Sequence, residues 1–113
     1  MRRGEVWVAN LNPNRGAEIG KVRPVLILQS DVVGPGLVPT VVVLPMTSRT
    51  RPGLRHLRVS IPARDQLKVD SHVAVDQPRT LDRKRVGDGP LAQLTENELL
   101  AVERALKAVL DFE

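Results

Sequence analysis

One arginine and one threonine stand where two consecutive strands could present them together. Arg23 lies at the start of a predicted buried strand over residues 22–30, and Thr47 follows a second predicted strand over residues 38–46. If these strands pair antiparallel as a hairpin, both residues lie at the same end of the sheet and their side chains can converge. A guanidinium binds phosphate oxygens through two hydrogen bonds, and a hydroxyl can donate to the same oxygens. The pair therefore suits chemistry on phosphate.

Short strands must position this pair. Further strands are predicted over residues 5–11, 55–61 and 71–76. A bend or sheet edge is expected at Pro78, because proline cannot donate to a strand ladder. A turn is expected over residues 87–90. A long polar loop, which begins at residue 12 and runs on to Val22, could close over a ligand.

The hydrophobic period changes near the C-terminus. Thr95 and Glu98 match a capping box, and the apolar residues at helical spacing after it are Leu99, Val102, Leu106 and Val109. One amphipathic helix is therefore predicted to end the chain. The fold class is mainly β (α+β): a small, strongly bent antiparallel sheet with a C-terminal helix. Residues 1–113 form a single domain, because a chain of this length can bury one core but not two.

Charge and composition narrow the partners. Residues 1–90 carry fifteen Lys and Arg against eight Asp and Glu, and thirteen of the seventeen cations in the chain are arginine. An anionic partner is the natural inference. There is no cysteine, and His56 and His72 share no ligand spacing, so we expect no metal and no cofactor. No apolar run has the length of a signal peptide or a membrane span, so we expect a soluble cytoplasmic protein.

Motifs along most of the chain resemble one known family. They are RGEVW at residues 3–7, NLNP at 10–13, GAE at 16–18, GKVRPVLI at 20–27, MT at 46–47 and VDQPRTLD at 75–82. These segments are similar to the MazF/PemK family of toxin endoribonucleases. The resemblance implies an SH3-like barrel and a homodimer whose subunits form an RNA groove along their interface. It also implies an antitoxin whose acidic, flexible segment blocks that groove.

The resemblance also implies an activity: the toxin of a type II toxin-antitoxin system that cleaves single-stranded mRNA at specific sequences without a metal. The 2′-hydroxyl of the substrate can itself attack the adjacent phosphorus. The family carries its catalytic arginine and threonine at the positions of Arg23 and Thr47. Glu18 matches the family's glutamate and is the better acid-base candidate, because a guanidinium is a poor base. Glu18, Arg23 and solvent all remain open as the general base.

Polar and basic residues near the pair are candidate RNA contacts. They are Arg15, Lys21, Ser48, Arg49, Ser71, Gln77 and Arg79. Gln77 could equally be a turn-stabilising amide, and Ser71 a strand-start hydroxyl. The four arginines within residues 49–58 have no acid among them, which favours contact with a polyanion. His56 and His72 are acid-base candidates by residue type, but the family relies on no histidine at either place.

Two other functions remain as alternatives. One is a toxin of the related CcdB fold group, which poisons DNA gyrase by protein binding. The other is a non-catalytic SH3-like module that only binds RNA. Arg23 together with Thr47 favours the nuclease, because a gyrase binder needs no phosphate clamp. Trp7 and Phe112 are the only aromatic residues, which argues against a binder that stacks bases on several aromatics.

Overall fold

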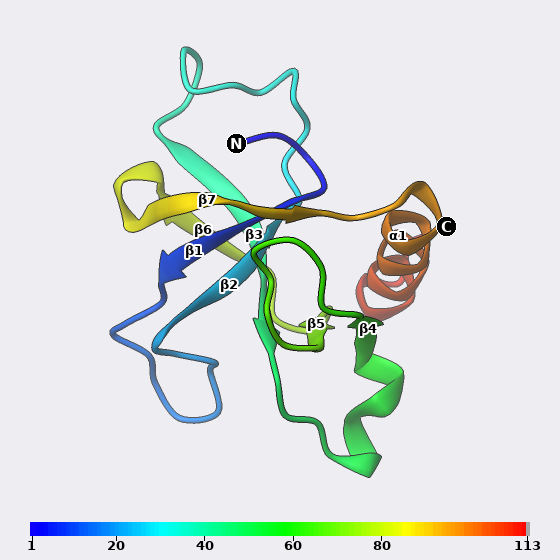
Figure 1. Ribbon diagram of the computed structural model, residues 1–113. Helices are drawn as coiled ribbons and strands as arrows, with labels where there is room; N and C mark the ends of the chain where they lie inside the picture. The colour runs from blue at the N-terminus through cyan, green and yellow to red at the C-terminus, as the bar shows by residue number, and fades with distance from the viewer. Residues whose placement is uncertain (113) are drawn as a thin grey trace.

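Residues 1–112, which the computed structural model describes, form seven antiparallel strands and one C-terminal α-helix (Figure 1). The elements are β1 (Glu5–Asn10), β2 (Val22–Ile27), β3 (Thr40–Thr47), η1 (Pro52–Leu57), β4 (Arg58–Ile61), β5 (Ser71–Ala74), β6 (Arg79–Asp82), η2 (Arg83–Arg85), β7 (Val86–Gln93) and α1 (Glu96–Leu110). The short elements η1 and η2 are 3₁₀ helices. The predicted class, mainly β with a C-terminal helix, is confirmed.

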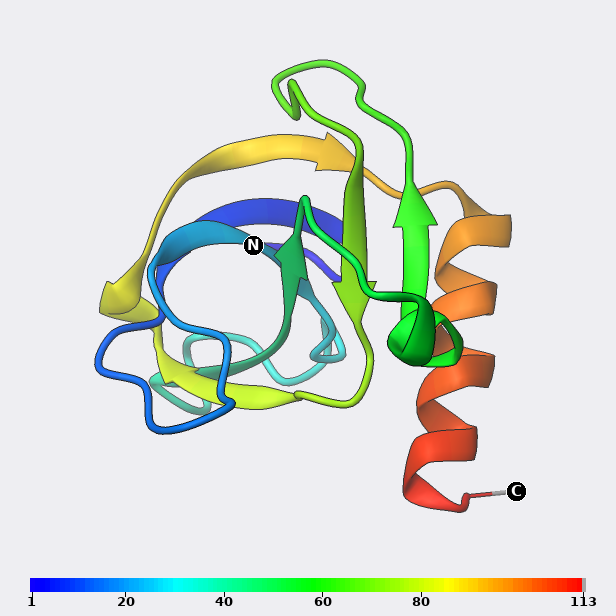
Figure 2. The same cartoon turned by 90° about the horizontal axis from the view of Figure 1, so that it is seen from below.

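Strand β3 is shared by two parts of the sheet. The strand order is β4-β5-β3-β2-β1-β7, and β6 also pairs with β3. Val43 of β3 pairs with Arg79, and Met46 pairs with Val73, so two residues of β3 face the five residues 74–78. These extra residues contain Pro78 and form the bend that the sequence predicted there. Seen from below, the strands themselves bend into a ring (Figure 2).

Two groups of buried side chains fill opposite faces of the sheet. The first, which includes the helix residue Val102, consists mainly of Val6, Leu26, Leu44, Met46, Ile61, Val73 and Val102. The second contains Ala9, Leu11, Val25, Ile27, Val41, Val43 and Leu81. Because neighbouring strand residues point to opposite faces, Val25, Leu26 and Ile27 enter the two groups alternately. Both faces of β2 are therefore buried, which explains its unbroken apolar sequence.

Helix α1 covers the first group with a single stripe of side chains. The predicted capping box is present: the Thr95 hydroxyl accepts from the Glu98 N–H, and the Glu98 carboxylate accepts from the Thr95 N–H. Val102 is fully buried, whereas Val109 is exposed, because the last turns of the helix run past the sheet (Figure 2). Neither α1 nor the 3₁₀ helices in residues 1–112 have the length and apolar character that crossing a bilayer requires.

The turn predicted over residues 87–90 is wrong, since this segment lies within β7. Residues 88–91 stand opposite Trp7 alone in the pairing of β1 with β7. Gly89 lies so close to the indole that a Cβ there would be 2.5 Å from the ring of Trp7. Gly89 therefore lets β7 widen around a large side chain instead of reversing the chain.

The strand predicted over residues 55–61 is shorter than expected. Residues 52–57 form η1, with Pro52 in its first turn, and the strand begins only at Arg58. Proline favours the start of a helical turn because its φ is already close to the helical value. His56 therefore lies in η1 and not on a strand face.

Candidate functional site

The pairing of β2 with β3 brings Arg23 and Thr47 together. Val25 pairs with Pro45, and the same register continued by two residues places Arg23 opposite Thr47. Both residues line one hollow of about 330 Å³, together with Ser48. We call this the Arg23–Thr47 hollow. It contains a guanidinium and a hydroxyl, two groups that can donate hydrogen bonds to phosphate oxygens.

The loop before β2 fixes the orientation of Arg23. The Arg23 Nε donates to the carbonyl of Gly20 at 2.7 Å. A Cβ at Gly20 would lie 2.1 Å from the side-chain oxygen of Asn14, so a larger residue there would displace the Asn14 side chain. The two terminal nitrogens of Arg23 have no hydrogen-bond partner within residues 1–112, so they remain available to a ligand. Burial lowers the pKa of Arg23 from its ordinary value.

Hydroxyl groups line the other side of the Arg23–Thr47 hollow. The Thr47 oxygen accepts from the Arg49 backbone N–H at 3.2 Å, so its own hydrogen remains free to donate. Ser71 also lines the hollow, but it is buried and donates to the Val69 carbonyl at 2.9 Å. Its donor is therefore already used, as a strand-start hydroxyl would use it.

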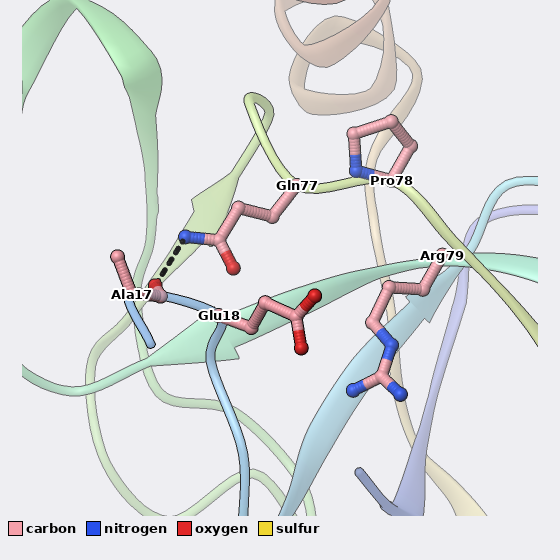
Figure 3. Close-up of a pocket in the computed structure, with 5 residues that line it drawn as sticks. All are labelled: Ala17, Glu18, Gln77, Pro78 and Arg79. Carbon is pink, nitrogen blue, oxygen red and sulfur yellow. Dashed lines mark hydrogen bonds between the residues drawn. The ribbon is translucent and has the colours of Figure 1, made fainter. Parts of the chain in front are cut away.

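Glu18 lies in a neighbouring hollow of about 390 Å³, lined by Ala17, Glu18, Gln77, Pro78 and Arg79 (Figure 3). We call this the Glu18 hollow. The Glu18 carboxylate accepts from the Arg15 backbone N–H at 2.7 Å, and it forms no ion pair with Arg23 within residues 1–112. The structure therefore does not bring Glu18 to the Arg23–Thr47 hollow in this conformation of the loop.

Gln77 and Arg79 hold the loop that carries Glu18. The Gln77 Oε1 accepts from the Ile19 N–H at 2.8 Å. Its Nε2 donates to the Ala17 carbonyl at 3.3 Å (Figure 3). Arg79 Nη1 donates to the carbonyls of Leu11 and Ile19 at 2.8 and 3.4 Å. Both ends of the Gln77 amide are thus occupied by the loop backbone, as expected of a turn-stabilising amide.

A third hollow joins the other two. It has a volume of about 590 Å³ and shares Thr47 with the Arg23–Thr47 hollow, and Ala17 and Gln77 with the Glu18 hollow. We call it the arginine hollow, because Arg49, Arg51 and Arg58 line it. Among residues 1–112, neither histidine lines any of these three hollows.

Several site residues were not indicated by the sequence. Gln66 and Lys68 line the Arg23–Thr47 hollow from the segment between β4 and β5, and Asp76 lines the arginine hollow. Lys68 belongs to no motif, and only the folded chain brings it near Arg23. Arg15 and Lys21 are exposed on the loop, and the left-handed backbone of Lys21 (φ 71°) is held by a hydrogen bond from its N–H to the Asn12 side chain. Among residues 1–112, no three His, Asp or Glu side chains gather as metal ligands would.

Comparison with known proteins adds to this geometry. The family model of the PemK-like, MazF-like toxin of type II toxin-antitoxin systems matches residues 2–110. Among solved structures, MazF from Deinococcus radiodurans superposes with a TM-score of 0.84 at 28% identity, covering 99% of this chain and 97% of that one.

Two further solved structures are similar over nearly their whole length. The toxin MazF-mt6 of Mycobacterium tuberculosis has a TM-score of 0.79 at 26% identity, with 96% of this chain and 98% of that one covered. An endoribonuclease from a mycobacterial species, solved in complex with its cognate antitoxin, has a TM-score of 0.78 at 22% identity, with 100% and 97% covered. The last likeness supports the fold alone.

Proposed function

The chain belongs to the PemK-like, MazF-like toxin family of type II toxin-antitoxin systems, and from this premise we propose that it is a toxin that cleaves single-stranded RNA at specific sequences. The observation that supports this most is the placement of Arg23, near the start of β2, and Thr47, at the end of β3, in one hollow. A free guanidinium beside a free hydroxyl matches the needs of phosphate chemistry.

The proposed reaction uses the substrate's own nucleophile. The 2′-oxygen loses its proton and attacks the adjacent phosphorus, and the bond from phosphorus to the 5′-oxygen of the next nucleotide breaks as that oxygen gains a proton. The products are a 2′,3′-cyclic phosphate and a free 5′-hydroxyl. Arg23 donates from its terminal nitrogens to the non-bridging oxygens, and the Thr47 hydroxyl donates to the same group. Both hydrogen bonds strengthen as negative charge grows on the non-bridging oxygens, which lowers the barrier.

Glu18 is the proposed acid-base residue. A carboxylate can accept the proton of the 2′-hydroxyl, whereas a guanidinium holds its own proton too tightly even when burial lowers its pKa. Glu18 lies in the Glu18 hollow, which the arginine hollow connects to the Arg23–Thr47 hollow. Its loop is held by hydrogen bonds with Gln77 and Arg79. The proposal therefore requires this loop to move toward Thr47 when RNA binds. The alternative proton acceptors are solvent and Arg23 itself.

We propose RNA and an antitoxin as partners. The excess of cations over residues 1–90 suits an RNA backbone, with exposed Arg15, Lys21, Ser48 and Arg49 as contacts. MazF from Deinococcus radiodurans was also solved together with MazE, in a structure 27% identical to this chain, and an acidic, flexible segment would fit the basic surface here. We also propose a homodimer with an RNA groove along its interface, acting in the cytoplasm.

Purified protein, incubated in EDTA with RNA of mixed sequence, tests the proposal. We expect cleavage with cyclic phosphate ends, and no cleavage of an RNA that carries 2′-deoxyribose at the scissile nucleotide. Binding without cleavage would show that the protein is a non-catalytic RNA-binding module. Neither binding nor cleavage would favour a toxin that acts on a protein target. Cleavage of the 2′-deoxy substrate would show that water attacks instead.

A further inference from the structure

Three cationic side chains line the arginine hollow, against two in the Arg23–Thr47 hollow and one in the Glu18 hollow. The three are Arg49, Arg51 and Arg58, with Asp76 as the one acidic residue among those that line the arginine hollow. Thr47 lines both this hollow and the Arg23–Thr47 hollow, so a ligand in one hollow would be adjacent to a ligand in the other. The arginine hollow therefore adjoins the Arg23–Thr47 hollow.

Strand pairing fixes the back wall of this hollow. Arg58, the first residue of β4, pairs with Ala74 of β5, and Asp76 follows two residues later. Arg58 Nη1 donates to the Asp76 carboxylate at 2.6 Å and to the Leu57 carbonyl at 2.9 Å. The side chain of Arg58 is only 8% exposed, which makes this pair part of the folded framework.

The positive charge of the arginine hollow is only partly compensated. The Arg58 Nε is buried and has no hydrogen-bond partner within residues 1–112. A buried polar group without a partner is costly, and such a group indicates a missing partner or a functional strain. Asp76 balances one of the three arginines. Arg49 and Arg51 are exposed and form no ion pair within residues 1–112, so the hollow has an excess of two positive charges.

The shape of the segment from β3 to β4 explains why the arginines meet. The chain leaves β3 at Thr47, passes Arg49 and Arg51, and returns through η1 to Arg58 at the start of β4. Two exposed arginines and one nearly buried, ion-paired arginine therefore line the same hollow. Arg55, from the same segment, is not among the residues that line it.

We propose that the arginine hollow binds one RNA phosphate next to the scissile phosphate. This assignment rests on the proposed function, and it adds Arg51, Thr50 and Arg58 to the residues that contact or attract the substrate. Arg49 and Arg51 would bind the phosphate oxygens, Thr50 would donate its hydroxyl, and the charge of Arg58 would attract the phosphate from behind. The site holds the RNA so that its scissile phosphate lies between Arg23 and Thr47.

The test measures the affinity for an uncleavable RNA that carries 2′-deoxyribose at the scissile nucleotide. Arg49→Ala and Arg51→Ala should each weaken binding about three- to tenfold and lower the slope of log affinity against log salt by roughly 0.7. Arg104→Ala removes an exposed arginine from α1 and should change neither quantity. Asp76→Asn keeps an acceptor for Arg58 but removes the opposing charge, so it should tighten binding.

A scan of neutral phosphates locates the contact. In each RNA one phosphate is replaced by an uncharged methylphosphonate, and wild type is compared with Arg51→Ala. At one phosphate flanking the scissile position, the two losses of affinity should not add, because both changes remove the same interaction. Additive losses at every position, or unchanged affinity for both arginine variants in a protein that cleaves RNA, would overturn the assignment. Failure of the wild-type protein to cleave any RNA would instead overturn the proposed function, and this assignment with it.

Discussion

The side-chain amide of Gln77 holds the backbone of Ile19, with 2.8 Å between the Gln77 Oε1 and the Ile19 nitrogen. The two residues are far apart in sequence, and this bond fixes the loop after β1 against the bend between β5 and β6. The same amide reaches Ala17, and Arg79 adds two bonds to the loop from the next strand. The position of Glu18 therefore depends on side chains outside its own loop.

Gln77→Ala should release this loop with little effect on the rest of the fold. The loss of two hydrogen bonds is expected to lower the free energy of unfolding by about 1–2 kcal/mol. Trypsin should then cut after Arg15 and Lys21 several-fold faster than in wild type. Gln29→Ala is the matched control, because Gln29 holds the backbone of a different loop. Equal cutting rates in wild type and Gln77→Ala would show that Gln77 does not hold the loop.

Arg23→Ala should abolish cleavage while the protein stays folded. The variant loses charge stabilisation in the transition state, which corresponds to a rate loss of about 10² to 10³-fold or more. Arg23→Lys is the informative comparison, since it keeps the charge but cannot make the two-pronged contact. Single-turnover rates and melting temperatures of both variants provide the measurement. Near-normal turnover in folded Arg23→Ala protein would contradict the mechanism.

Glu18→Gln should slow cleavage by about 10² to 10⁴-fold, as expected for loss of a general base, with a modest loss of RNA affinity. Glutamine keeps an acceptor for the Arg15 N–H, so the loop should remain in place and the melting temperature should hardly change. Glu96→Gln, which alters an exposed carboxylate on α1, serves as the control. An unchanged single-turnover rate would leave proton transfer to solvent or to Arg23.

Acid should weaken the anchor between α1 and the segment before β5. Arg64 donates two hydrogen bonds of 2.6 and 2.5 Å to Glu98, and these bonds lower the pKa of Glu98 below its ordinary value. A lowered folded-state pKa means that the stabilisation is present above the ordinary carboxylate pKa and is lost as the pH falls through the lowered one. Glu98→Gln should cost about 1 kcal/mol at pH 7, and the difference from wild type should shrink as the pH falls below 4. Unfolding midpoints across this pH range provide the check.

The proximity of Arg23 and Thr47 could be predicted from the sequence, because strand register determines it. Two apolar runs joined by a loop imply a hairpin, and antiparallel pairing then places Arg23 and Thr47 at one end. Lys68 and Gln66 were missed because their approach to that end depends on how the segment between β4 and β5 packs, which no periodicity records. β7 was missed because its Gly-Asp-Gly-Pro sequence has poor strand propensity, and only the packing of Gly89 against Trp7 explains it.

Every bond that Gln77 and Arg79 make to the loop ends on a main-chain atom. The anchor is therefore indifferent to side-chain identity at exposed loop positions such as Arg15 and Ala17. Substitutions there would alter the surface of the loop while its hydrogen bonds to Gln77 and Arg79 stay intact. A library randomised at these two positions would then separate preference for an RNA sequence from the ability to cut, and it would yield variants with new targets on an unchanged scaffold.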